Sequence, residues 1–390
     1  MVRKRFSRNK ESKQIAFCID LYKKTFPMLR KILYTLISCS QLGILFSCAE
    51  QIDAVSENYY IKSGKIYYIP GGNSFERGSV ETGADKNTFQ VLSADVAKDK
   101  AHIYYKGYAQ KQVDYSSFYL ENGLFKDKDH VYYSKNYSTE PGRPGNPEDR
   151  NQWNIVRLAD PKTYIPLAAP NQQWAKDKSR YFYNNEPLDV DYATYSIINK
   201  SFSADKNTLY INENRLIKPT KYVPISIDSL TNRYILLNHN TLLFYAGQLA
   251  EQQIQNSKDV RVLHNNVVCI DKKVIVDGNL FHRNEADASS FEILFISTSF
   301  FVAKDKNKVY YQEDIIDGAD AATYQNLYLA IGKDKDHVYS GTDIVHVPDP
   351  ASFHKIDDKN FDFADNKGNQ FKYVRKESKI RLQDQSGKLY

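Results

Sequence analysis

The sequence predicts an all-β protein built from tandem repeats of about 28 residues. The first reason is composition: 30 Tyr and 20 Phe stand against only 2 Met and 2 Trp, and Tyr and Phe favour the pleated, half-buried surfaces of sheets. The second is that two short motifs alternate along the chain at a nearly fixed spacing, which is typical of repeat architectures. Because this spacing is shorter than the roughly 40–45 residues of a four-stranded propeller blade, we expect an open superhelical or solenoid stack. A closed propeller-like ring is the alternative.

The N-terminal segment has the parts of a secretory signal. From Met28 the chain reads Met-Leu-Arg-Lys, then fifteen mostly apolar residues over 32–46, then Ser47-Cys48. A short cationic start, an apolar stretch and a small residue before the cut are typical of such signals, and the stretch is shorter than the ~20 residues of a membrane span. We therefore expect a lipoprotein-type signal peptide at 28–47. Residues 1–27 are then an over-called start or a basic extension, with translation beginning at Met28.

Cys48 is the expected site of lipidation. Leu45-Phe46-Ser47-Cys48 resembles a bacterial lipobox, although Phe46 stands where a small or β-branched residue is commoner. The interpretation implies a lipid anchor on Cys48, a tether over 48–56 and a place in the bacterial cell envelope. The alternative is a buried apolar helix in a cytosolic protein. Downstream of Cys48 the only cysteine is Cys269, in an apolar run, so no internal disulfide is expected.

The repeat array is expected over 57–356 and consists of two alternating signals. Asp-x-x-Ser/Thr-Phe/Tyr begins at Asp85, Asp114, Asp160, Asp191, Asp287, Asp320 and Asp349. Asp-Lys followed by an aromatic strand begins at Asp99, Asp127, Asp177, Asp205, Asp305 and Asp334. We expect Asp-Lys to form a hairpin turn, because Asp accepts backbone N–H bonds. In the other motif the acid caps a single turn and the aromatic ring anchors that turn in the core.

Each unit should therefore contain three or four short strands and no long helix. Degenerate copies without Asp-Lys occur at 238–245 and 264–270, and a degenerate first repeat occurs at 59–69. Residues 357–390 are expected to be a degenerate terminal repeat that caps the stack, since terminal repeats are usually atypical.

These motifs resemble the DKNYY family, bacterial proteins built on an aspartate-lysine and tyrosine-rich repeat. The resemblance covers about residues 85–356 and is weakest between 215 and 285. It implies the repeat architecture and an exported bacterial setting. It implies no mechanism, because the family has no assigned biochemical activity.

One segment breaks the period. An inserted loop at 137–153 includes the Gly- and Pro-rich run 141–150, and long loops on repeat scaffolds often bind. The candidate recognition residues are Arg143, Arg150 and Trp153, with Trp174 nearby. The alternative is an insertion without function.

The sequence contains no catalytic motif. A catalytic pair would be placed once, whereas the aspartates of the Asp-Lys turns recur in every unit, so we interpret them as structural. His102, His130 and His337 share one repeat position and lie a repeat or more apart, so we expect them at the solvent edge rather than around a metal. No Gly-rich phosphate loop, Gly-x-Ser-x-Gly or Cys-x-x-Cys is present. We expect no cofactor and no metal.

Charge argues against nucleic-acid binding. Residues 1–47 hold ten Lys or Arg and two acids, which leaves a net charge of −2 on the remainder, and phosphate binding needs a basic surface. We therefore expect a non-enzymatic surface scaffold that binds a protein or glycan, and the alternative is a hydrolase. A contiguous exposed aromatic stripe would favour binding. Acids from non-equivalent repeat positions at one pocket would favour the hydrolase.

Overall fold

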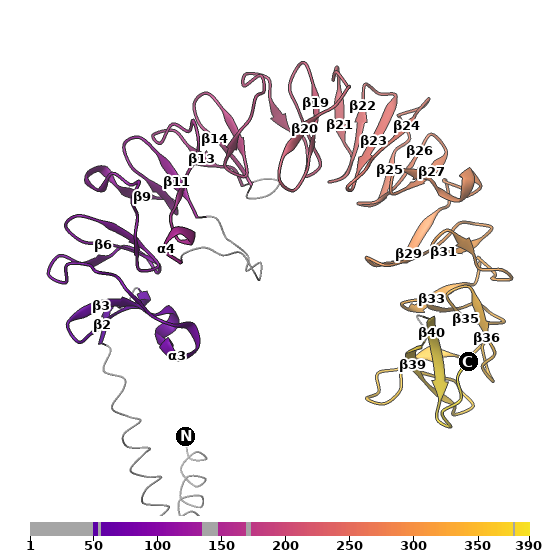
Figure 1. Cartoon of the computed structure of the whole chain (residues 1–390). Helices are drawn as coiled ribbons and strands as arrows, with labels where there is room; N and C mark the ends of the chain where they lie inside the picture. Colours follow the sequence, from indigo (N-terminus) through magenta and orange to yellow (C-terminus); the bar gives the residue numbers. More distant parts are fainter. Residues whose placement is uncertain (1–49, 54–55, 135–146, 169–172, 377–378) are drawn as a thin grey trace, which may run out of the picture. The chain divides into compact units, whose positions relative to one another are not determined.

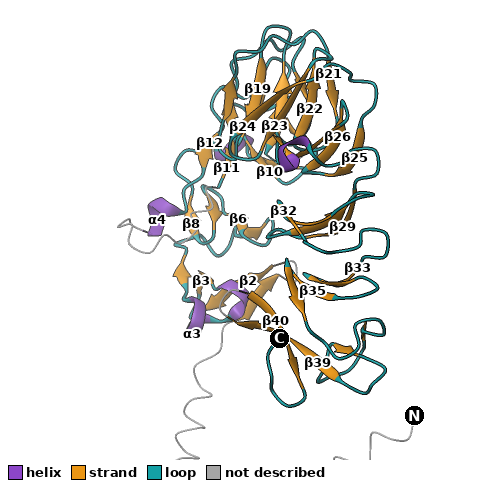
Figure 2. Cartoon of the chain, turned by 90° about the vertical axis from the view of Figure 1, so that its right-hand side faces the viewer, coloured by secondary structure: helices purple, strands orange, loops and turns teal. Residues whose placement is uncertain are grey.

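The computed structural model describes residues 50–53, 56–134, 147–168, 173–376 and 379–390. The expected signal peptide, Cys48 and Arg143 lie outside these residues. The structure divides into two compact units, Met1–Ile155 and Val156–Tyr390, which are described separately. Figures 1 and 2 show that both consist almost entirely of short strands and loops.

The first unit contains three four-stranded antiparallel sheets, each a simple meander. The first has β1 (Glu50–Asp53), β2 (Ser56–Lys62), β3 (Lys65–Tyr68) and β4 (Val80–Glu81). The second has β5 (Gln90–Val91), β6 (Val96–Lys98), β7 (Ile103–Tyr105) and β8 (Tyr108–Ala109). The third has β9 (Tyr119–Glu121), β10 (Leu124–Lys126), β11 (Val131–Tyr133) and β12 (Asn154–Ile155). Short helical turns connect them: η2 (Pro70–Gly72), α3 (Ser74–Arg77), η3 (Tyr115–Ser117) and α4 (Pro147–Arg150).

The second unit contains seven sheets of the same kind. The first sheet has β13 (Ile165–Pro166), β14 (Trp174–Lys176), β15 (Tyr181–Tyr183) and β16 (Glu186–Pro187), and the second has β17 (Ser196–Ile197), β18 (Phe202–Ala204), β19 (Leu209–Asn212) and β20 (Ile217–Pro219). The third has β21 (Ile227–Ser229), β22 (Tyr234–Leu237), β23 (Thr241–Tyr245) and β24 (Leu249–Gln253). The fourth has β25 (Arg261–His264), β26 (Val267–Ile270), β27 (Lys273–Val276) and β28 (Asn279–Leu280). After η4 (Phe281–Asn284) comes the fifth sheet, with β29 (Glu292–Ile296), β30 (Phe301–Lys304), β31 (Val309–Tyr311) and β32 (Asp314–Ile315). The sixth has β33 (Gln325–Tyr328), β34 (Ile331–Lys333), β35 (Val338–Ser340) and β36 (Asp343–Val345). The seventh has β37 (His354–Lys355), β38 (Phe363–Ala364), β39 (Gln370–Lys376) and β40 (Lys379–Asp384).

In a sheet that lies between two others of its unit, the two central strands are buried on both faces, because successive sheets pack against each other. Neighbouring residues of a strand point to opposite faces, and the core clusters follow this alternation. On β30, Ala303 packs with Val267 and Val274 of an earlier sheet, whereas Val302 packs with Tyr339 of the next one. The first and fourth strands remain the edges of their sheets, so none of the described sheets closes into a barrel.

The prediction of an all-β tandem-repeat protein with three or four strands per unit is confirmed. One boundary differs: β1 lies within 48–56, where a tether was expected, because its backbone pairs with β2 from Glu50↔Ile61 to Asp53↔Ser56. The degenerate first repeat at 59–69 is thus part of a complete four-stranded first sheet. In the described part of the chain, no helix is both long and apolar enough to cross a membrane.

Candidate functional site

The recurring carboxylates are the first candidates for chemistry, and the structure places them inside the repeat turns. We call Asp99, Asp127, Asp177, Asp205, Asp305 and Asp334 the turn aspartates; each lies between the second and third strand of its sheet and is at most 5% exposed. Oδ1 of each accepts the backbone N–H groups two and three residues further on, at 2.7–2.9 Å. This closes the hairpin.

The second carboxylate oxygen joins the turn to the segment before the sheet. Oδ2 of each turn aspartate accepts, at 2.9–3.0 Å, the backbone N–H of the aspartate that opens the preceding Asp-x-x-Ser/Thr motif. In five of the six turns it also accepts a tyrosine hydroxyl five residues further on, at 2.5–2.9 Å. The exception is Asp177, where that residue is Phe182.

The two motifs are therefore one interlocked unit. We call Asp85, Asp114, Asp160, Asp191, Asp287 and Asp320 the linker aspartates; each forms a salt bridge with the lysine that follows a turn aspartate. The backbone N–H of that lysine also donates to the Ser or Thr hydroxyl of the linker motif, at 3.0–3.3 Å. The aspartates, the lysine and the Ser or Thr hydroxyl of the repeat signature thus bond to one another within each repeat.

Hydrogen bonding lowers the pKa of Asp99, Asp127, Asp205, Asp305 and Asp334. Burial alone would raise the pKa of Asp99, but the donors from Asp85, Ala101, Tyr104 and His102 outweigh it and lower this pKa to about 2. The pKa values of Asp127, Asp205, Asp305 and Asp334 are lowered by the same balance. Such groups are ionised acceptors at neutral pH, where they are poor general acids.

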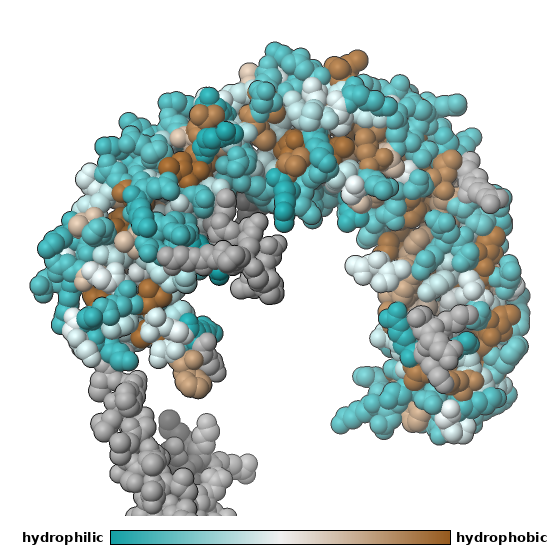
Figure 3. Space-filling view, in the orientation of Figure 1, coloured by the Kyte–Doolittle hydropathy of each residue, from teal (hydrophilic) through white to brown (hydrophobic). Residues whose placement is uncertain are grey.

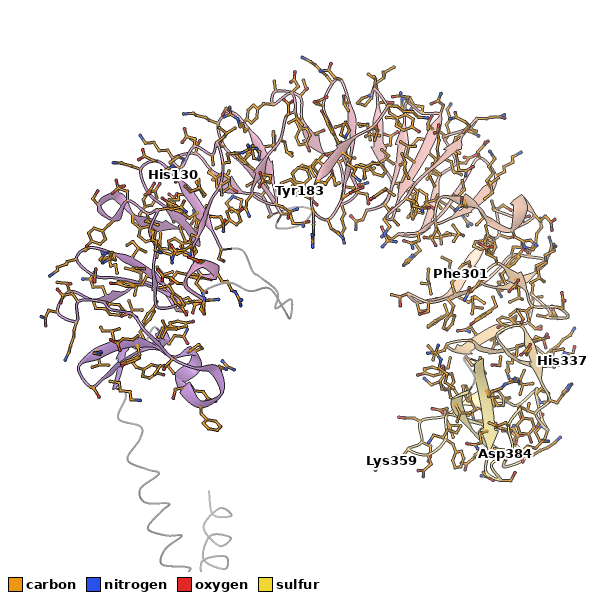
Figure 4. The ribbon with its side chains drawn as sticks, in the orientation of Figure 1. His130, Tyr183, Phe301, His337, Lys359 and Asp384 are labelled. Carbon is orange, nitrogen blue, oxygen red and sulfur yellow. The ribbon has the colours of Figure 1, made fainter. Side chains whose placement is uncertain are left out.

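The three histidines occupy the third position after a turn aspartate. His102, His130 and His337 are 41–56% exposed, with Nδ1 at 3.6–4.0 Å from Oδ1 of their own turn aspartate. Figure 4 shows His130 and His337 each at the turn of its own sheet. Within the described ranges, no group of three or more His, Cys, Asp or Glu residues has a metal-binding arrangement.

Of the four candidate recognition residues, Arg150 is exposed on α4, whereas both tryptophans are buried, in contrast to the expected surface patch. Trp153 is 3% exposed and stacks on Phe125 at 4.2 Å between ring centroids, because the chain re-enters the core immediately before β12. Trp174 is 1% exposed, since it begins the central strand β14. Neither ring is available to a surface ligand.

An aromatic surface that the sequence did not single out lies near the C-terminal end of the second unit. We call it the C-terminal aromatic patch: Phe295, Phe300, Tyr311, Tyr328 and Tyr373, all partly exposed. The ring centroids are 5.4 Å apart for Phe295–Phe300 and Phe300–Tyr311, and 5.7 Å apart for Tyr328–Tyr373. Lys355 lies over the Tyr328 ring at 4.5 Å, and the charge of Arg375 acts on both Tyr311 and Tyr373. In Figure 3, apolar surface gathers over β29 and its neighbours.

The repeat motifs do not reveal the patch as a whole: Tyr311 belongs to an Asp-Lys aromatic strand, but the other members come from three other strands and from the loop before β30. Phe295 and Tyr328 lie on the first strands β29 and β33, which are adjacent edges. Tyr373 lies on β39, which is longer than the strand β38 beside it. The arrangement depends on how the sheets stack, which the repeat spacing alone does not specify.

A shallow groove of about 510 Å³ lies between the edge strands β24 and β28. Glu251, Asp277 and Asn279 are among its lining residues. A hydrogen bond from the Tyr222 hydroxyl lowers the pKa of Glu251, whereas burial raises the pKa of Asp277. The two acids come from non-equivalent positions of their sheets.

The comparisons with known proteins agree with the repeat geometry. The DKNYY family model matches the chain over residues 10–136, 59–214 and 174–343, and these matches together extend over more than half of its length. Searches of curated proteins and of solved structures found no match. The turn aspartate, its lysine and the tyrosine that donates to the carboxylate supply the repeated signature, and the chain belongs to the DKNYY family.

Proposed function

We propose that this protein is a non-enzymatic scaffold of the bacterial cell envelope, anchored by a lipid on Cys48, that binds a protein or a glycan through its β-repeat surface. The observation that carries the binding role is the C-terminal aromatic patch. Two neighbouring groups of partly exposed rings, flanked by cations, have the surface composition that partners contact most productively.

The chemistry of the patch suits recognition. Tyr328 and Tyr373 offer both an apolar ring face and a hydroxyl, and Lys355 and Arg375 add positive charge beside the rings. Such rings stack on the apolar faces of sugars or on peptide side chains. Because three sheets contribute to the patch, the packed repeats fix its geometry before a ligand arrives, which reduces the entropic cost of binding.

The recurring carboxylates support the same reading. Every turn aspartate is occupied by backbone donors of its own unit, and the linker aspartates are paired with lysines. These carboxylates therefore serve the fold, and a hydrolase would need acids from non-equivalent positions.

The anchoring role is tested by membrane fractionation with metabolic palmitate labelling of wild type and Cys48→Ala. We expect label and membrane association in the wild type and loss of both in the variant. A wild-type protein that is soluble, unlabelled and still carries residues 28–47 would contradict the anchor.

The binding role is tested by comparing the wild type with the double variant Tyr328→Ala/Tyr373→Ala for retention on immobilised envelope polysaccharides and envelope proteins. We expect the double variant to lose at least tenfold in affinity, since aromatic hot spots each contribute about 2 kcal/mol or more. Tyr119→Ala is the matched control, because Tyr119 is 36% exposed on an edge strand of the first unit. Equal retention of the double variant and the control would contradict a role for the patch.

The groove between β24 and β28 favours a second candidate, a polysaccharide hydrolase. Two acids from non-equivalent positions, Glu251 and Asp277, are among its lining residues, and their pKa values are moved in opposite directions. Release of reducing sugar from envelope polysaccharides, abolished in Glu251→Gln and in Asp277→Asn, would favour this function over the scaffold. No release by the wild type would remove it.

A further inference from the structure

Phe75 is the most exposed large apolar side chain in the described part of the chain. It is 98% exposed and lies in α3, within the loop that joins β3 to β4 of the first sheet. Leaving a phenylalanine ring in water forgoes the burial that such a side chain normally provides. Arg77 in the same loop is also exposed.

The loop belongs to the outer face of the first sheet. The inner face, with Tyr59, Ile66 and Tyr68, packs against the second sheet. Tyr60 follows Tyr59 on β2 and therefore points to the opposite face. A Cβ on Gly72 would lie only 2.7 Å from the Tyr60 hydroxyl, so the loop is folded closely against that outer side.

Chain length places this face near the expected anchor. Only Ala49 separates Cys48 from Glu50, the first residue of β1. An extended chain spans at most about 3.6 Å per residue, so β1 begins within about 7 Å of Cys48. Because the second sheet covers the inner face, the outer face and the β1 edge are what the first sheet can present to a bilayer.

We propose that the outer face of the first sheet is a membrane-seating surface, in which Phe75 enters the boundary between lipid headgroups and acyl chains. Arg77 and the exposed Lys62 then lie among the headgroups. Glu76 and Glu81 balance these basic residues, so the apolar ring, rather than a net positive charge, is what this face contributes to an interfacial membrane contact. The inference rests on the proposed lipid anchor, and it gives the protein a second contact that orients the repeats relative to the bilayer.

The test uses the full-length protein, expressed and processed in cells and recovered in vesicles that contain nitroxide-labelled lipids. Phe75→Cys carries an environment-sensitive thiol fluorophore. Cys48 would be occupied by lipid and Cys269 is buried, so the new thiol is the accessible one. Ile225→Cys is the matched control, because Ile225 is 90% exposed on a loop of the second unit. Neither substitution removes a core contact.

We expect blue-shifted emission and quenching by the nitroxide lipids at position 75, with neither effect at position 225. Palmitate labelling of the same samples separates the possible failures. If the label is present and position 75 remains aqueous, the seating surface is wrong while the anchor stands. Equal quenching at both positions would show non-specific adsorption and also overturn the proposal. If the wild type carries no palmitate label, both the lipid anchor and the seating surface are wrong.

Discussion

The tyrosine hydroxyl that donates to a turn aspartate stabilises the repeat but is not needed for the turn to form. Tyr104 is 2% exposed and donates to Oδ2 of Asp99 at 2.8 Å. The Asp177 turn forms with Phe182 at the corresponding position, so the hydroxyl is not required for the turn. We expect Tyr104→Phe to lower the free energy of unfolding by about 1–2 kcal/mol, measured by urea denaturation. Tyr67→Phe is the control, because its bond to Glu81 is exposed, and it should cost less than ~0.5 kcal/mol. Equal losses would refute the argument.

The close contact between the Tyr324 ring and Gly332 limits the size of the side chain that position 332 can carry. A Cβ on Gly332 would lie 2.1 Å from the Tyr324 hydroxyl, and that hydroxyl is buried without a hydrogen-bond partner among the described residues. In an earlier sheet, Phe291 and Ala303 occupy the equivalent positions of one core cluster. We therefore expect Gly332→Ala to cost about 1–3 kcal/mol through overpacking and Tyr324→Phe to restore part of it, because the ring carbon Cζ would still lie 2.4 Å from the new Cβ. A double-mutant cycle in urea checks this, and simple additivity of the two changes would contradict it.

At the scale of the repeat element, the lowered pKa values predict loss of stability in acid. The pKa of Asp99 is about 2 in the folded protein, against an ordinary 3.8. Its contribution is therefore fully present above pH 3.8 and is lost as the pH falls through about 2. The other turn aspartates with lowered pKa values act in the same direction.

We expect the urea midpoint of the wild type to fall between pH 5 and pH 2.5. Asp99→Asn should be less stable at pH 5 and should lose less on acidification, because the titrating group is gone. A wild-type midpoint that does not change over this range would show that the carboxylates do not stabilise the turns.

The repeat signature made the strands and turns of each four-stranded sheet largely predictable. Asp-Lys fixed the central hairpin and Asp-x-x-Ser/Thr the turn before each sheet, but only the structure shows that their backbone and side-chain groups bond to each other. Between 215 and 285 the signature is lost while the sheets persist. In the β22–β23 hairpin, for example, Asn238 and His239 adopt positive φ and the backbone N–H of Asn240 donates to the Leu237 carbonyl. Trp153 was expected on the surface because it follows a Gly- and Pro-rich loop, yet burial of its ring on Phe125 dominates. The C-terminal aromatic patch depends on contacts between sheets, which repeat spacing does not encode.

At the scale of the whole molecule, stability should be transmitted mainly between neighbouring sheets. The core clusters join successive sheets, and the chain divides into two compact units. In such arrays each repeat is stabilised by its own contacts and by the interfaces with its neighbours. A defect in one turn should therefore open adjacent sheets and leave remote ones protected.

Asp99→Ala provides the test, because it leaves four hydrogen-bond donors without their acceptor in the second sheet. We expect faster amide hydrogen exchange over β1–β12, because the second sheet shares one core cluster with the first sheet and another with the third. Exchange over β33–β40 should be unchanged, because those sheets lie in the other unit and share no core cluster with Asp99. Asp334→Ala is the reciprocal variant and should reverse the pattern. If either variant accelerated exchange uniformly along the chain, the repeats would unfold as one cooperative block rather than by neighbour-to-neighbour coupling.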